Sequence, residues 1–177
     1  MQTGATQIAT EMIAKAAVAT NMEIRVDDLT GPEIAMLLQA HLDALTTITA
    51  KGSMHALDLA ALRKPEITFW SAWSGPELLG CGALKELNPE QAELKSMRTA
   101  AAHLRKGVAS AMVRHIIAEA RQRKYRRLYL ETGASGHFTA AHHLYAKCGF
   151  TRCGHFEGYG PDPNSVFMML DLERAGI

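Results

Sequence analysis

The sequence predicts a single α/β (α+β) domain, built on a mixed central β-sheet of about six to seven strands that is flanked by helices. Three observations predict this fold. Short runs rich in apolar residues recur along the chain, and segments with apolar residues at helical spacing lie between some of them. Some predicted strands follow each other through a tight turn, whereas others are joined by a helix, so the sheet is expected to be mixed. The 177 residues, 47% of them hydrophobic and 21% charged, suit one domain with a real core.

The first part of the chain begins with a short predicted strand that leads into a helix. Thr30 is a candidate N-cap, with Pro32 in the first turn and Glu33 three residues after the cap. Apolar residues then recur near the helical period, which predicts a helix over 32–45. A loop follows, and it carries a second short predicted helix from Leu57 to Arg63.

The rest of the chain alternates predicted strands with two further helices. The segments EITFWSAWSG (66–75) and ELLGCGALKEL (77–87) are joined by a Ser-Gly-Pro-Glu turn, which predicts a hairpin. The helical stripe over 107–123 predicts the longest helix. The remaining predicted elements are strands at 92–99 and 126–132, a helix over 137–149 that Gly149 ends, and strands at 150–156 and 165–172.

Composition narrows the possible functions. The net charge of +1 does not indicate a nucleic-acid partner, so any anion site must be local. The three cysteines lack CxxC spacing, which favours reduced thiols in a cytoplasmic protein, and no His/Cys cluster predicts a metal site. No apolar stretch predicts a membrane span. Residues 1–21 lack the pattern of a signal peptide and are expected to form a helical extension or tail, which leaves one domain over 22–177.

A basic turn, Leu104-Arg105-Lys106-Gly107-Val108-Ala109, separates the strand at 92–99 from the longest helix. The first amides of a helix lack intrahelical partners, and the helix dipole adds partial positive charge there, so phosphates bind well at such a position. Gly107 allows a close approach to the backbone, while Arg105 and Lys106 add charge. Taken alone, the turn favours an ordinary helix start whose basic side chains are solvated. It contains neither a Walker loop nor a GxGxxG fingerprint.

The same turn resembles the pyrophosphate loop of GNAT N-acetyltransferases, whose pattern is Arg/Gln-x-x-Gly-x-Gly/Ala at the start of a long helix. Leu104 stands where that family has Arg or Gln. A second segment, 140–150, resembles the family helix that ends in Leu-Tyr-x-x-x-Gly-Phe, with Phe138 where the family often has asparagine. The resemblance runs from about Met22 to Leu172 and matches in element order. The segments SMHALDLAAL, ELKSMRT, LETG and PDPNSVFM resemble, more narrowly, one bacterial subgroup of small-molecule acetyltransferases.

The resemblance implies acetyl-CoA as co-substrate. Its pyrophosphate would rest on the amides from Arg105 to Ala109, and its pantetheine arm would lie beside the strand at 92–99 like an added strand. A backbone amide of Met97 or Thr99 would then also polarise the thioester carbonyl. The residues implied to bind the cofactor are Met97, Arg98, Thr99, Leu104, Arg105, Lys106, Gly107, Val108, Ala109, Ser110, Phe138 and Ala141.

The resemblance also implies two catalytic residues. Tyr145 matches the family tyrosine that faces the CoA sulfur and would protonate the leaving thiolate, although the helical pattern alone favours an ordinary core tyrosine. Glu93 lies where histone-acetylating members carry their base. Strand alternation puts Glu93, Lys95, Met97 and Thr99 on one face, so a simple ion pair between Lys95 and Glu93 is the alternative to a base.

The expected function is therefore direct transfer of an acetyl group to the amine of a small molecule. The family covers its acceptor pocket with the segment before the first central strand, which implies Ser53, His55 and Leu57 as substrate contacts. Tyr159, in the Gly/Pro-rich loop 158–164, is a candidate for the pocket rim, or belongs to a plain solvent loop. The alternatives are a non-catalytic acetyl-CoA sensor and an acyltransferase with a protein or oxygen acceptor. Members of the family are often homodimers.

Overall fold

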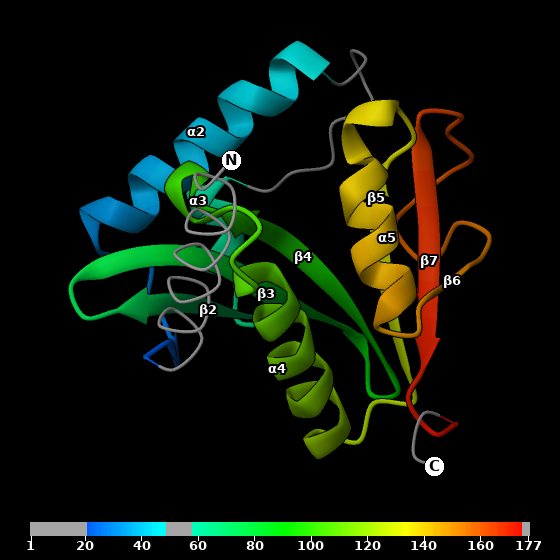
Figure 1. Cartoon of the computed structure of the whole chain (residues 1–177). Helices are drawn as coiled ribbons and strands as arrows, with labels where there is room; N and C mark the ends of the chain where they lie inside the picture. Colours follow the sequence, from blue (N-terminus) through cyan, green and yellow to red (C-terminus); the bar gives the residue numbers. More distant parts are fainter. Residues whose placement is uncertain (1–20, 49–57, 175–177) are drawn as a thin grey trace, which may run out of the picture.

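The computed structural model describes residues 21–48 and 58–174, and these form a seven-stranded sheet with helices on both faces (Figure 1). The order of the elements is the one that the sequence predicts. They are β1 (Glu23–Val26), α2 (Pro32–Ile48), α3 (Leu59–Leu62), β2 (Ile67–Ser74), β3 (Glu77–Asn88), β4 (Gln91–Thr99), the 3-10 helix η1 (Ala101–His103), α4 (Val108–Gln122), β5 (Arg127–Gly133), the 3-10 helix η2 (Gly136–Phe138), α5 (Thr139–Lys147), β6 (Thr151–Arg152) and β7 (Ser165–Asp171).

Several predicted boundaries differ from those of the structure. The Thr30 hydroxyl donates to the Asp28 carboxylate at 2.6 Å, so Thr30 does not act as the predicted N-cap. Helix α2 begins at Pro32. The described part of the second short helix is α3, and Asp58 caps it by accepting from the Ala61 amide at 2.8 Å. The strand expected over 150–156 is confined to the two residues of β6.

The strands follow the order β1-β2-β3-β4-β5-β7-β6. All neighbours pair antiparallel except β4 and β5, which are parallel and are joined through α4. The β4–β5 ladder covers only Gln91–Leu94 against Arg127–Leu130. Beyond Leu94 the two strands diverge, and Figure 1 shows β4 leaning away from β5 and β7. This divergence opens the sheet at the C-terminal end of β4.

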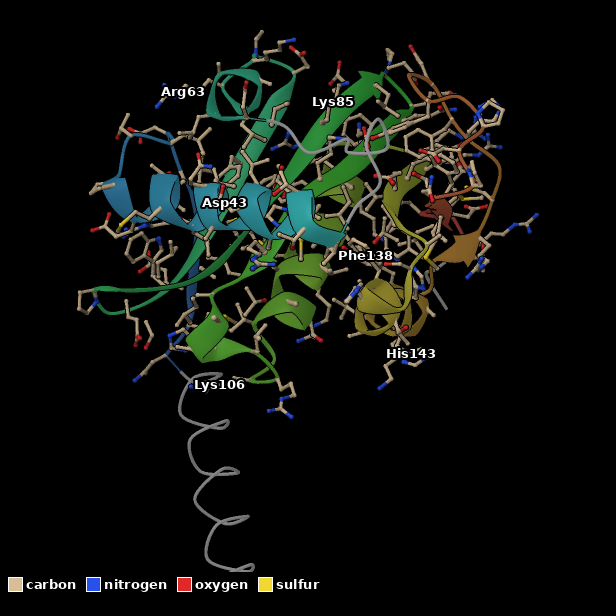
Figure 2. All side chains as sticks on the ribbon, turned by 90° about the horizontal axis from the view of Figure 1, so that it is seen from above. Asp43, Arg63, Lys85, Lys106, Phe138 and His143 are labelled. Atoms are coloured by element: carbon tan, nitrogen blue, oxygen red, sulfur yellow. The ribbon has the colours of Figure 1, made fainter. Side chains whose placement is uncertain are left out.

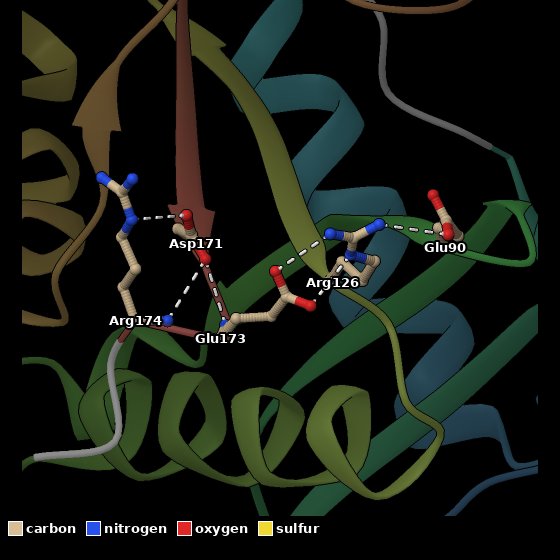
Figure 3. Close-up of polar contacts among 5 residues, drawn as sticks. All are labelled: Glu90, Arg126, Asp171, Glu173 and Arg174. Carbon is tan, nitrogen blue, oxygen red and sulfur yellow. Dashed lines mark hydrogen bonds and ion pairs between the residues drawn. The ribbon is translucent and has the colours of Figure 1, made fainter.

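Polar contacts surround the opposite, closed end of the two strands, where β5 begins (Figure 3). Arg126 lies directly before β5, and its Nε donates to Glu173 at 2.9 Å while its Nη1 lies 3.4 Å from Glu90 in the β3–β4 turn. The Arg126 amide also donates to the Glu90 carbonyl oxygen at 2.8 Å. The exposed ion pairs contribute little to stability. The backbone hydrogen bond and the β4–β5 ladder are what keep β4 and β5 together at this end.

The helices bury the two faces of the sheet in two cores. One core packs α4 and α5 against β3, β4, β5 and β7, and its members include Met112, Ile116 and Tyr145. The second core packs α2 and α3 against the other face of β2 and β3, around Ile34 and Leu62. Because alternate residues of a strand point to opposite faces, each residue of β4 belongs to the side of α2 or to the side of α4 and α5.

A β-bulge changes this alternation in the middle of β4. Ser96 has φ 53°, in the left-handed region, and the register passes from the Ala83–Lys95 pair to the Cys81–Arg98 pair, so that two β4 residues oppose Gly82. Met97 therefore packs against the α4 core beside Gly82. The prediction that Met97 and Thr99 share a face with Glu93 and Lys95 is wrong, because the extra residue reverses the pattern after Ser96. Arg98 takes that place instead.

Candidate active site

The divergence of β4 from β5 opens a cleft of about 370 Å³. Its walls come from β4, β5, α2 and α5, so it passes between the strands from one face of the sheet to the other. Glu93 and Lys95 line it on the side of α2, and Tyr145 lines it on the side of α5. The further lining residues are His41, Ala44, Leu45, Ile48, Leu94, Ser96, Met97, Arg98, Leu104, Glu131, Thr132, Gly133, His137, Phe138, Ala140 and Ala141.

Glu93 is the most buried carboxylate of the cleft, with 2% of its surface exposed. Lys95 Nζ lies 2.8 Å from its Oε1, so the ion pair that the sequence offered as an alternative is formed. The Tyr159 hydroxyl donates to the same oxygen, and Lys95 Nζ lies 2.7 Å from the Tyr159 oxygen. Both partners of Glu93 use Oε1. Oε2 is therefore the oxygen that this carboxylate can offer to a molecule in the cleft.

An aromatic cluster holds Tyr159 behind this ion pair. Its ring packs at 4.8 Å from Phe156 and 5.5 Å from Phe167, and Phe156 stacks on Tyr129 at 4.8 Å. Burial raises the pKa of the Tyr159 hydroxyl, and the neighbouring Glu93 carboxylate raises it further, so the hydroxyl stays protonated and acts as a donor. The structure thus places Tyr159 as a support of Glu93 and Lys95, and it is not among the residues that line the cleft.

Tyr145 reaches the cleft from α5 and has 7% of its surface exposed. It packs edge-on against Phe150 at a centroid distance of 5.9 Å, so it belongs to the core and lines the cleft at the same time. Burial raises the pKa of its phenol, with smaller contributions from Cys148 and Glu131. The side chain is consequently a neutral hydroxyl at neutral pH.

Phe138 closes the wall between β5 and α5. Its ring packs against Gly133 so closely that any Cβ there would collide with it. His142 Nε2 forms a 2.8 Å hydrogen bond with the Gly133 carbonyl oxygen and joins the start of α5 to the end of β5. Figure 2 shows Phe138 between the end of α2 and α5, whereas Lys106 lies at the surface beside the start of α4.

The predicted phosphate-binding turn lies beyond the rim of the cleft. Gly107 is the N-cap of α4 with φ 88°, and Arg105 before it has φ 61°. Gly107 has no side chain to cap the helix, and no other side chain of residues 21–48 or 58–174 does so, which leaves the first amides of α4 available to a ligand. Leu104, 56% exposed, links the turn to the cleft.

The predicted cofactor residues therefore divide into two groups. Met97, Arg98, Leu104, Phe138 and Ala141 line the cleft. Thr99 and Arg105 to Ser110 do not line it, and they continue from it toward the α4 N-terminus. The predicted acceptor contacts Ser53, His55 and Leu57 lie outside the described residues.

The sequence reasoning missed His41 and Glu131. His41 sits on the apolar stripe of α2, and burial together with the charge of Arg98 lowers its pKa to about 4, so it is neutral at neutral pH. Glu131 accepts a 2.6 Å hydrogen bond from the Ser165 hydroxyl. A polar residue on the apolar stripe was the only sequence signal for His41. The sequence carried no signal for Glu131, because its position in the cleft depends on where β5 diverges from β4.

Within the described ranges 21–48 and 58–174, no group of three or more His, Cys, Asp or Glu side chains is arranged to hold a metal ion. No helix in those ranges is long and apolar enough to cross a membrane. The buried Cys81 thiol has its pKa raised to about 12 by burial, which makes it an inert core residue.

Known proteins resemble the chain in sequence and in fold. A model of the Acetyltransferase (GNAT) family matches residues 34–150. The uncharacterized N-acetyltransferase YsnE of Bacillus subtilis (strain 168) is 56% identical over 151 residues, which are 85% of this chain and 100% of that protein. An acyl-CoA N-acyltransferase structure from Klebsiella pneumoniae superposes with a TM-score of 0.71 at 31% identity, covering 85% of this chain and 97% of the other. A Bacillus subtilis acetyltransferase solved in complex with CoA has a TM-score of 0.62 at 21% identity, covering 85% and 98%. The chain therefore belongs to the GNAT acetyltransferase family.

Proposed function

We propose that the protein transfers the acetyl group of acetyl-CoA directly to the amine of a small molecule. The acetyltransferase family to which the chain belongs fixes the reaction class and the co-substrate. The observation that carries the finer proposal is the cleft through the sheet. It brings a carboxylate, Glu93, and a protonated phenol, Tyr145, into the lining of one cavity from the two faces of the sheet.

The residues of the cleft fit acetyl-CoA. The first amides of α4, behind Gly107, are suited to the pyrophosphate because they are unpaired and lie at the positive end of the helix dipole. The edge of β4 beyond Leu94 has lost its partner strand, so its backbone groups can pair with the amides of the pantetheine arm. Phe138 and Ala141 offer an apolar wall on the α5 side.

Tyr145 is the proposed acid. As the amine nitrogen attacks the thioester carbonyl and the C–S bond breaks, the Tyr145 hydroxyl donates its proton to the sulfur. Burial keeps the phenol protonated, so the donor form is fully populated at neutral pH. The apolar surroundings disfavour the free thiolate and the phenolate alike, so the proton that Tyr145 gives to the sulfur is replaced from solvent as the thiol leaves.

Glu93 is the proposed base. It accepts the proton that the amine loses, directly or through one water, and Oε2 is the available oxygen because Lys95 and Tyr159 both hold Oε1. In this arrangement the ion pair and the base role are compatible. Lys95 and Tyr159 fix the orientation of the carboxylate, and Glu93 handles the proton.

The test is the release of free thiol from acetyl-CoA with a panel of amines. We expect amine-dependent release by the wild type, and a fall in kcat of about 100-fold or more in Tyr145→Phe at unchanged fold. Tyr125→Phe is the matched control, because Tyr125 is a buried tyrosine whose hydroxyl bonds Glu86 away from the cleft. Turnover that survives Tyr145→Phe would remove the proposed acid. Binding of acetyl-CoA without thiol release to any amine would favour a sensor, and acetylation of a protein or a hydroxyl instead would replace the acceptor class.

A further inference from the structure

Arg98 is a cation in the cleft to which no carboxylate of the described ranges is paired. Among the described residues it forms no ion pair and no side-chain hydrogen bond, and its Nε is buried without any partner. The other cation on the same face, Lys95, is by contrast bound to Glu93 and Tyr159. A buried guanidinium N–H without an acceptor lowers the stability of the fold, unless a ligand supplies the acceptor.

His41 presents a second orphan atom beside Arg98. Its Nδ1 is buried without a partner in the part of the chain that the structure describes, and His41 and Arg98 both line the cleft. The two side chains are close enough for the charge of Arg98 to act on the imidazole. A neutral imidazole still carries one N–H, so the pair can offer donors from two directions to a single anionic group.

The β4 bulge puts Arg98 on the side of the cleft where His41, Glu93 and Lys95 lie. Arg98 points to the face of α2, together with Glu93 and Lys95, whereas the unpaired amides for the cofactor phosphates lie at the start of α4. With one residue taken up by the bulge, the Cα atoms of Glu93 and Arg98 are about 13 Å apart along the strand. Two long side chains and a molecule of amino-acid size together fill such a span.

We propose that Arg98, with His41, binds the carboxylate of the acceptor, so that the substrate is an amino-acid-like molecule whose amine reaches Glu93. Arg is the side chain best suited to a carboxylate, because its planar fork matches both oxygens. Ala44, Leu45 and Ile48 of α2 form the wall next to this subsite and favour an apolar side chain on the acceptor. This inference rests on the proposed function.

The experiment compares amino acids with their decarboxylated amines. The pairs are phenylalanine with 2-phenylethylamine and leucine with isopentylamine, each assayed by thiol release from acetyl-CoA with the full chain. We expect the wild type to favour the carboxylate-bearing member of each pair. Arg98→Gln should raise KM for phenylalanine about 10- to 100-fold and leave KM for 2-phenylethylamine and for acetyl-CoA unchanged. Arg98→Lys keeps the charge and should recover part of the loss, and Arg152→Gln, at an exposed arginine of β6, should change nothing.

Binding of 3-phenylpropionate, which has the carboxylate but no amine, separates this inference from the proposed function. Calorimetry should detect its binding to the wild type and its loss in Arg98→Gln. Thiol release that prefers the decarboxylated amines, or a loss in Arg98→Gln that falls equally on both members of a pair, would overturn the subsite. A raised KM for acetyl-CoA alone would assign Arg98 to the cofactor. If no amine releases thiol, the proposed function fails, while the calorimetric result still decides whether the carboxylate subsite exists.

Discussion

His41 makes the stability of the fold depend on pH, and a single substitution can separate its contribution from that of other groups. Its pKa falls from 6.5 to about 4 in the folded state because of burial and the charge of Arg98. As the pH drops below 6.5, the unfolded chain takes up a proton at this position that the folded chain refuses until about pH 4. Folding stability is therefore lost progressively between pH 6.5 and pH 4. The loss attributable to this residue is about 2–3 kcal/mol.

His41→Gln removes the titration and keeps a polar side chain of similar size. Urea unfolding at pH 7 and pH 4.5 should show a smaller loss of unfolding free energy in the variant than in the wild type. Since other groups titrate in both proteins, only the difference between the two losses reports on His41. Equal losses would mean that the imidazole is solvated in the folded state.

Individual side chains were predicted from the sequence where strand and helix periods decide their place. The contact between Lys95 and Glu93 follows from a spacing of two on one strand, and it is formed. The side of Arg98 was not predictable, because nothing distinguishes Ser96 as a residue with positive φ before the bulge is seen. Tyr159 meets Glu93 across 66 positions of the chain, and a sequence period does not report such a contact.

At the scale of elements, the start of α4 depends on the backbone of Gly107. Its φ of 88° is a left-handed conformation that an alanine adopts only with strain, although open space surrounds the position where a Cβ would stand. Gly107→Ala should therefore lower the unfolding free energy by about 1–2 kcal/mol through the backbone alone. It should also weaken acetyl-CoA binding, because the first amides of α4 shift.

Gly154→Ala is the control for this prediction. Gly154 also has open space around it, but it has no positive φ, so alanine should leave stability unchanged or raise it slightly. Urea unfolding measures the first effect and calorimetry with acetyl-CoA the second. If both variants behave alike, the left-handed Gly107 does not set the geometry of the turn.

For the molecule as a whole, the order of the elements was predicted because each carries a strong local period and clear turn residues. The mixed sheet followed from the hairpin beside the strand–helix–strand unit, and the structure confirms it. The opening between β4 and β5 was not predicted from the residues, since it arises where a ladder ends and depends on the pairing of both strands. The resemblance to the GNAT family supplied what the local patterns lacked, namely the expectation that a pantetheine arm lies beside the strand at 92–99.

Bound acetyl-CoA should add a connection across the opening beyond Leu94, where the ladder between β4 and β5 has ended. The ladder between β4 and β5 stops at Leu94, so amides of Lys95–Thr99 that face the cleft have no strand partner in the free protein. A bound pantetheine arm would supply that partner. When the free acetyl-CoA concentration is about 100 times its dissociation constant, binding stabilises the folded protein by about 2.7 kcal/mol. Amides that can exchange only after the ligand has left should then exchange roughly 100-fold more slowly.

Hydrogen exchange followed by mass spectrometry should therefore show this slowing on β4 after Leu94. The amides of Gln91–Leu94 serve as the internal reference, because their ladder to β5 is already formed in the free protein. Gly107→Ala should reduce the slowing in proportion to its loss of affinity. Uniform slowing over all strands would indicate a general gain in stability, and no slowing on β4 would mean that the arm does not lie along this strand. Because β4 diverges from β5 after Leu94, we expect bound acetyl-CoA to protect amides of Lys95–Thr99 from exchange and to leave those of Gln91–Leu94 unchanged.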